Sequence, residues 1–267
     1  MKILYFILFA LLAGALQGKG PKIVAWTERQ DWGVFFEKEN TEGTIVIHSD
    51  KSNATLVYNP DRAKQRFIPA STFKIPHTLF VLDAGIIRDE QQVIPWNGVK
   101  YGISGWNKDQ TLQTAMQNST VWVYQRFAAK LGTEREEQYL QKIKYGNMDP
   151  SGNLKRFWLD GKLAISAVEQ IQFLKQLNAE SLPFERKYQK MVKRLIKSEE
   201  GEDWVIRAKT GWAVKKGPDL GWWVGWVETP KDTTYFALNI SMPNGLKDAP
   251  NRQRIVKEIL QDQKMLP

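Results

Sequence analysis

The chain has 267 residues, of which 42% are hydrophobic, so it can bury the core of one large globular domain or of two closely joined subdomains. Its 38 basic and 29 acidic residues give a formal net charge of +9, but the two signs are interspersed along the chain. We therefore expect a solvated surface that favours small anionic ligands, and no nucleic-acid interface. There is no cysteine and there are only two histidines, which excludes disulfides and a thiol nucleophile and argues against a metal site.

The first residues resemble an export signal. Met1-Lys2 is followed by an apolar run over 3–12 and then by small residues, so we assign 1–18 as a signal peptide and 19–267 as a single domain. The apolar run is short for a membrane span, and no second run of that length follows it. Export without cysteines favours a bacterial periplasm, with no membrane anchor after removal of the signal.

Taken in chain order, the first predicted elements are strands. Alternating runs separated by turn residues predict strands over 34–36, 43–48 and 54–58. A long stretch with helical periodicity follows. The first predicted helix of this stretch begins at Ser71. Further helices are predicted over 111–118, with Asp109 as the cap, over 121–131 and over 134–144. A Ser166–Glu169 capping box opens a helix over 171–177, and a last one runs from Pro183 to about 196.

The strand pattern returns near the C-terminus. Aromatic and β-branched residues predict strands over 204–209, 221–228 and 234–242, before a last helix over 251–263. We therefore expect an α/β (α+β) fold in which an antiparallel sheet is built from both chain ends, 21–68 and 202–267, and is flanked by helices. An all-helical region, 69–201, is inserted between them. An active site would lie where the two regions meet.

Ser71 and Lys74 form a Ser-x-x-Lys box. Two residues three positions apart lie on the same face of a helix, so the Lys74 amine can reach the Ser71 hydroxyl. The amine can take the serine proton only if its surroundings keep it neutral or convert it into a stronger base. Free backbone N–H groups at the helix start could also hold an oxyanion. One such box is expected by chance in a chain of this size, so an ordinary polar helix start is the favoured explanation until further motifs are found.

The two histidines do not complete a catalytic triad with Ser71. His48 falls within an alternating pattern and is expected to be a strand residue. His77 lies six positions after Ser71, which turns it away from the serine on a helix.

Three further boxes follow the first one. They are Ser119-Thr120-Val121, Tyr145-Gly146-Asn147 and Lys209-Thr210-Gly211. Each alone has an ordinary explanation. The first can be a break between two helices, the second the end of a helix, and the third the end of a strand. In this order and spacing they resemble the serine acyltransferases that include penicillin-binding proteins and serine β-lactamases. The Tyr-Gly-Asn box narrows the resemblance to class D, the OXA-type β-lactamases, and stretches such as 157–161 and 221–226 extend it over the mature chain.

This resemblance implies a β-lactam hydrolase that confers antibiotic resistance, with 19–267 as its catalytic domain and small-molecule β-lactams as its substrates. Ser71 would form the acyl-enzyme, and Lys74, modified by carbon dioxide to N6-carboxylysine, would be the general base for acylation and deacylation. Ser119, near Lys209, would pass a proton to the leaving nitrogen, and the backbone N–H groups of Ser71 and Trp212 would hold the oxyanion. No metal and no cofactor besides carbon dioxide or bicarbonate is implied.

The resemblance also implies binding residues. Trp158 would donate its indole N–H to the carbamate, with Val121 and Leu159 as an apolar cover. The substrate-binding residues would be Lys209, Thr210, Gly211 and Arg252 near the substrate carboxylate, and Trp106 and Trp212 as walls around its side chain. For the three tryptophans, plain core packing is the alternative. The short loop over 213–220 resembles that of class D enzymes that accept carbapenems, so carbapenem hydrolysis is an expectation.

Two other functions share these boxes. A β-lactam sensor domain is acylated without turnover, but it normally follows several membrane spans. A peptidoglycan transpeptidase usually has Ser-x-Asn at the position of Ser119-Thr120-Val121, and is usually larger and anchored. The sequence leaves both a monomer and a homodimer open.

Overall fold

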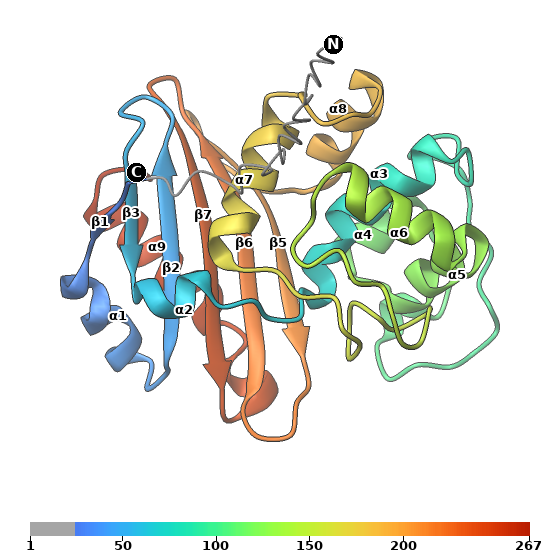
Figure 1. The fold of residues 1–267 in the computed structure, drawn as a ribbon, viewed down its shortest axis with the longest axis horizontal. Helices are drawn as coiled ribbons and strands as arrows, with labels where there is room; N and C mark the ends of the chain where they lie inside the picture. The colour runs from blue at the N-terminus through green and yellow to red at the C-terminus, as the bar shows by residue number, and fades with distance from the viewer. Residues whose placement is uncertain (1–24) are drawn as a thin grey trace, which may run out of the picture.

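The computed structural model describes residues 25–267 (Figure 1), so the predicted signal peptide lies outside the described residues. Within them, seven strands form one sheet in the order β1-β3-β2-β7-β6-β5-β4. The strands are β1 (Thr27–Glu28), β2 (Gly43–Ser49), β3 (Thr55–Tyr58), β4 (Lys197–Glu200), β5 (Val205–Ala213), β6 (Asp219–Glu228) and β7 (Thr233–Met242). Pairing of β2 with β7 joins the two chain ends in the middle of the sheet. The expected mixed fold with a sheet from both ends is confirmed, although the two-residue β1 runs parallel to β3.

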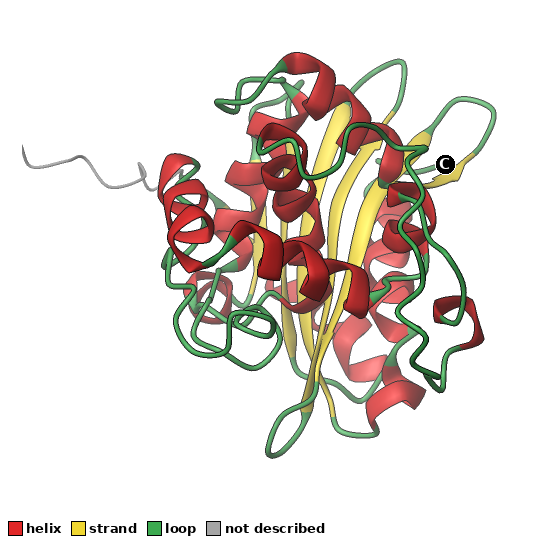
Figure 2. Ribbon diagram, turned by 90° about the vertical axis from the view of Figure 1, so that its right-hand side faces the viewer, coloured by secondary structure: helices red, strands yellow, loops and turns green. Residues whose placement is uncertain are grey.

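Helices cover both faces of this sheet (Figure 2). The α-helices are α1 (Gly33–Lys38), α2 (Pro60–Lys64), α3 (Lys74–Asp83), α4 (Leu112–Gln117), α5 (Val121–Leu131), α6 (Thr133–Lys142), α7 (Ala167–Asn178), α8 (Arg186–Leu195) and α9 (Asn251–Asp262). Short 3-10 helices are η1 (Gln30–Trp32), η2 (Ala70–Phe73), η3 (Ser104–Trp106) and η4 (Gly245–Asp248). Helices α1 and α9 share one apolar core with one face of the sheet, whereas α7 and the helical region α3–α6 share the other core.

The predicted strand over 34–36 is wrong, because these residues lie in α1. Trp32 and Phe36 are four positions apart, and both are buried against the sheet, which is a helical spacing. The cap of α4 is Thr111, whose hydroxyl accepts the Thr114 N–H. Asp109, the predicted cap, instead accepts the N–H of Trp96.

Strand β4 was not expected, because it lies at the end of the predicted helical region. Its sequence, Lys197-Ser198-Glu199-Glu200, has no apolar residue. The strand lies at the edge of the sheet, where it pairs only with β5, and its side chains are largely exposed to solvent. Backbone pairing with β5, rather than burial, selects its conformation. The Ser166–Glu169 capping box of α7 is confirmed, with hydrogen bonds in both directions.

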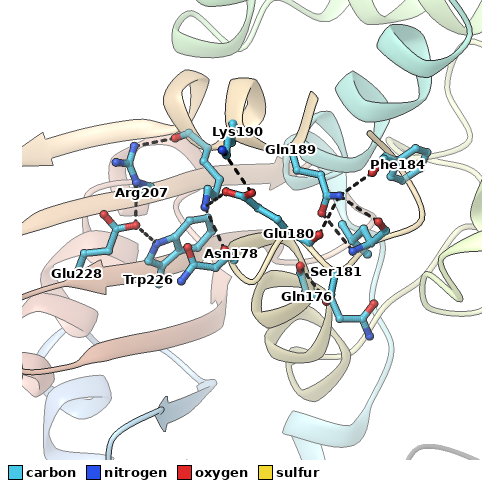
Figure 3. A network of polar contacts seen from close by, with 12 residues as sticks. Gln176, Asn178, Glu180, Ser181, Phe184, Gln189, Lys190, Arg207, Trp226 and Glu228 are labelled. Atoms are coloured by element: carbon cyan, nitrogen blue, oxygen red, sulfur yellow. Dashed lines mark hydrogen bonds and ion pairs between the residues drawn. The ribbon is translucent and has the colours of Figure 1, made fainter. Parts of the chain in front are cut away.

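A polar network connects the segment between α7 and α8 to the sheet (Figure 3). The buried Gln189 amide donates to the carbonyls of Leu182 and Phe184. Arg207 of β5 donates to Glu228 of β6 and to the carbonyl of Lys193 in α8. Because charge-assisted hydrogen bonds are directional, this network fixes the position of β5 relative to α8.

Gly146 and Asn147 attach the loop after α6 to the body of the protein. Asn147 accepts the Ala164 N–H with its side chain and donates to the Lys162 carbonyl. Gly146 has a φ of +56°, and a Cβ atom there would lie 2.1 Å from the Ala164 carbonyl oxygen. The Tyr-Gly-Asn box is therefore, in part, a structural lock on the chain that follows Trp158.

Among residues 25–267, no helix combines the length and the hydrophobicity needed to cross a bilayer.

We predict that Gly146→Ala destabilises the fold, because the side chain adds left-handed backbone strain and a collision with backbone. The free energy of unfolding should fall by roughly 2–4 kcal/mol. Urea unfolding measures the change, and Gly102→Ala is the matched control, since nothing lies within 4 Å of a Cβ at that site. Equal stability of the two variants would contradict the proposed lock.

Candidate active site

Ser71 and Lys74 meet at the junction of η2 and α3. Ser71 lies in η2, Lys74 is the first residue of α3, and the Lys74 Nζ is 2.8 Å from the Ser71 Oγ. Ala70, directly before the serine, has a left-handed φ of +49°, which is uncommon for a residue with a Cβ. Such strain persists only where the surrounding structure holds it, and it often marks functional sites.

The Lys74 amine is fully buried. Loss of solvation lowers the pKa of Lys74 well below its usual value, and the nearby positive charge of Lys209 lowers it further. The face of the Tyr124 ring lies 5.0 Å from the amine. Both effects favour the neutral amine, whose nitrogen can accept the proton of the Ser71 hydroxyl.

Strand β5 brings the Lys209-Thr210-Gly211 box to the serine. Gly211 lies so close to η2 that a Cβ there would be 3.0 Å from the Pro69 carbonyl oxygen. Ala208 donates its N–H to Ile196, on the side of β5 away from β6. Because N–H directions alternate along a strand, the N–H groups of Thr210 and Trp212 point to that same edge. Pairing with β4 ends at Arg207, which leaves this part of the edge uncovered.

Lys209 and Arg252 form a cationic region beside this edge. Burial, and then the charge of Arg252, lower the pKa of Lys209 to about 7. The Lys209 ammonium donates to the Thr210 carbonyl at 3.1 Å, and Arg252 donates to the carbonyls of Gly211 and Ala249. Two cations held this close by backbone carbonyls are available to an anionic ligand. Arg254, two positions further along the helix, instead contacts Glu39 at the surface.

Ser119 occupies the break between α4 and α5 and has a left-handed φ of +53°. No hydrogen bond joins its hydroxyl to Lys209 among residues 25–267. The left-handed backbone places the short polar side chain of Ser119 between two helices. Ala70, directly before Ser71, has a similar left-handed conformation.

The predicted apolar residues come together in one cavity of about 350 Å³. Four of them line it, namely Trp106, Val121, Leu159 and Trp212. Lys209 and Thr210 line a second cavity of about 250 Å³, between α4, β4 and β5. The predicted apolar residues and Lys209 thus line separate cavities.

Trp158 is fully buried, and its indole N–H has no hydrogen-bond partner among the described residues. Its ring lies 5.8 Å from that of Phe73, the residue between Ser71 and Lys74 in the box. An unpaired buried donor is uncommon in folded proteins, so this one requires an explanation beyond core packing.

Several residues that support the site were not found from the sequence. Asp219 accepts the Trp212 indole N–H at 2.8 Å across the β5–β6 hairpin. Gln170 of α7 donates to the Thr72 hydroxyl and lies within 3.5 Å of the Tyr145 hydroxyl. Arg156 and Asp160 form an ion pair at the rim of the apolar cavity. Of these contacts, only that between Trp212 and Asp219 could have been predicted from the sequence, by a correct assignment of the hairpin register.

Comparison with known proteins supports a family assignment. A family model described as the penicillin binding protein transpeptidase domain matches residues 34–261. Beta-lactamase OXA-20 of Pseudomonas aeruginosa is 48% identical over 267 residues, covering 99% of both chains. Beta-lactamase OXA-2 of Salmonella typhimurium is 50% identical over 242 residues, 90% of this chain and 86% of the relative. Beta-lactamase OXA-48 of Klebsiella pneumoniae is 42% identical over 260 residues, 96% of each chain.

Solved structures agree with these relatives. The crystal structure of FUS-1 (OXA-85), a class D beta-lactamase from Fusobacterium nucleatum subsp. polymorphum, superposes with a TM-score of 0.87 at 36% identity. The match covers 90% of this chain and all of the other one. The resemblance seen in the four boxes is confirmed, and the chain belongs to the class D, OXA-type, serine β-lactamases.

Proposed function

We propose that this enzyme hydrolyses penicillin-type β-lactams through an acyl-enzyme on Ser71 and so confers resistance to them. The observation that carries the proposal is the fully buried Lys74 amine, which lies 2.8 Å from the Ser71 hydroxyl and whose pKa is lowered well below its usual value by burial. A serine becomes nucleophilic only when a neighbouring base takes its proton, and Lys74 is the base within reach.

The acylation half needs an oxyanion site and a proton donor. The N–H of Trp212, at the open edge of β5, and that of Ser71 are the proposed oxyanion donors. Ser119 is the proposed carrier of a proton to the leaving ring nitrogen, with Lys209 as the adjacent source. Lys209, Thr210 and Arg252 would bind the substrate carboxylate, and Gly211 lets β5 approach the serine closely.

The site also fits a carboxylated Lys74. Only a neutral amine reacts with carbon dioxide, and burial shifts the pKa of Lys74 in the direction that favours this form. A buried carbamate needs hydrogen-bond donors, and the Trp158 indole N–H is a buried donor without a partner. Val121 and Leu159 line the adjacent apolar cavity. Carboxylation would supply an anionic base that serves both halves of the reaction, so that water can release the acyl group.

Trp106 and Trp212 would contact the substrate side chain, and Asp219 holds the second of these rings in place. The β5–β6 turn over 214–218 is short, which supports carbapenems as additional substrates. We also propose a periplasmic location after removal of the signal peptide, with small-molecule β-lactams as substrates and either a monomer or a homodimer as the assembly.

We predict that Lys74→Ala abolishes penicillin turnover, because Ser71 loses its base. The steady-state rate should fall by about three orders of magnitude or more. The measurement is a time course of hydrolysis by the purified mature protein, and Lys130→Ala, at an exposed lysine, is the control. Wild-type turnover in Lys74→Ala would overturn the assignment of the base.

The same time course separates the alternative functions. Multiple turnovers by the wild type support hydrolysis, whereas a single stoichiometric burst that bicarbonate cannot extend would indicate a sensor or a transpeptidase. Replacing the penicillin with a carbapenem tests the wider substrate range, which undetectable turnover would exclude.

Trp158→Phe should raise the bicarbonate concentration needed for half-maximal activity by about tenfold, because a supporting hydrogen bond to the carbamate is lost while the ring remains. Activity is titrated with bicarbonate after brief acid exposure. Trp226→Phe, which removes a buried indole N–H in the sheet, is the control. A Trp158→Phe enzyme with the wild-type bicarbonate response would contradict this role.

The pH dependence should report Lys209. Its pKa of about 7 means that the ammonium is lost as pH rises through neutrality, so kcat/KM for a penicillin should fall on the alkaline side. Arg252→Met removes a neighbouring positive charge, which raises the Lys209 pKa and should move this limb upward by roughly 0.5–1 pH unit.

Arg254→Met, at an exposed cation on the same helix, should leave the limb in place. A limb that does not move in Arg252→Met would show that another group controls it.

A further inference from the structure

A histidine and a glutamate lie in contact inside the protein, one turn of α3 away from Lys74. The Nε2 atom of His77 is 2.7 Å from the Oε1 atom of Glu136 in α6, and both side chains are completely buried. The two atoms lie at ion-pair distance but lack the alignment of a hydrogen bond. Neither side chain has a hydrogen-bond partner among residues 25–267. The proposed mechanism uses neither residue.

The two side chains depend on each other. They lie at ion-pair distance, and neither has a hydrogen-bond partner among residues 25–267. An unpaired buried carboxylate is expensive, and a buried pair with one partner removed is strongly destabilising. Each residue therefore holds the other in place, and together they connect α3 to α6.

The His77 ring also packs against the aromatic residues around the Lys74 amine. It stacks on Phe73 at 5.2 Å and lies 5.6 Å from Trp158 and 5.8 Å from Tyr124, between ring centres. The Lys74 Nζ lies over that same Tyr124 ring. A displacement of His77 would therefore move the rings that exclude water from Lys74 and that orient the Trp158 N–H.

We infer that His77 and Glu136 are a positioning pair that controls how firmly Lys74 retains carbon dioxide. The inference rests on the proposed carboxylation of Lys74. Neither residue touches the substrate. Their effect reaches the reaction through Phe73 and Trp158, in the way that supporting residues orient the groups that contact a bound ligand.

The test is the carbamate signal of Lys74 in ¹³C NMR spectra recorded with ¹³C-labelled bicarbonate, together with activity as a function of bicarbonate. Lys74→Ala, which should show no signal, assigns the resonance. Glu136→Ala should reduce the signal at low bicarbonate and raise the half-maximal bicarbonate concentration about tenfold or more. Glu137→Ala, at an exposed carboxylate on the same helix, should match the wild type.

Glu136→Gln keeps the size and an acceptor oxygen at this position and should recover most of the signal that Glu136→Ala loses. If Glu136→Ala does not fold, the double variant His77→Phe, Glu136→Leu replaces the pair by apolar groups of similar volume, a change that buried pairs often tolerate. It too should require more bicarbonate than the wild type.

Two outcomes overturn the inference and are distinguishable. A wild-type enzyme without a carbamate signal would remove the proposed carboxylation, and the role of the pair with it. A normal wild-type signal that is unchanged in folded Glu136→Ala or in the double variant would leave the proposed function in place and show that the pair only stabilises the fold.

Discussion

The burial of one lysine amine is the constraint on which the active site depends. An exposed lysine is an ammonium at neutral pH and cannot take a proton from serine. Lys74 differs because α3 begins at that residue and carries its side chain directly into the core between the sheet and the helical region. The loss of solvation is compensated by the Ser71 hydroxyl at 2.8 Å and by the face of Tyr124. The proposed role of Lys74 as a base thus follows from the way the core packs around its amine.

The four sequence boxes contribute to this burial in different ways. Lys209 arrives on β5, whose position follows from pairing with β6 and from the Arg207 network, and its charge disfavours an ammonium at Lys74. The Tyr-Gly-Asn box acts by fastening the chain around it, as the lack of space at Gly146 indicates. Ser119 is held in a strained conformation between two helices. Some motif residues are therefore proposed to take part in the reaction, whereas others keep those residues in position.

Each error in the predicted elements has a physical cause. The aromatic run at 34–36 has strand-like composition, but the buried spacing of Trp32 and Phe36 suits a helix lying on the sheet. Strand β4 has no apolar pattern because an edge strand needs only backbone pairing, supplied by residues that follow it in the chain. Asp109 was a reasonable cap by type, yet Thr111 had the correct geometry.

The sequence by itself determined the fold class and the family and predicted the principal site residues, since these depend on local periodicity and on ordered motifs that chance does not assemble. Only the tertiary structure decided which of these side chains meet, how deeply Lys74 is buried, and that Asp219 holds Trp212. It also revealed the buried contact of His77 with Glu136, two residues that no motif connects. The burial of Lys74 and the contact of His77 with Glu136 arise between segments far apart in the chain, and local sequence patterns do not specify such contacts.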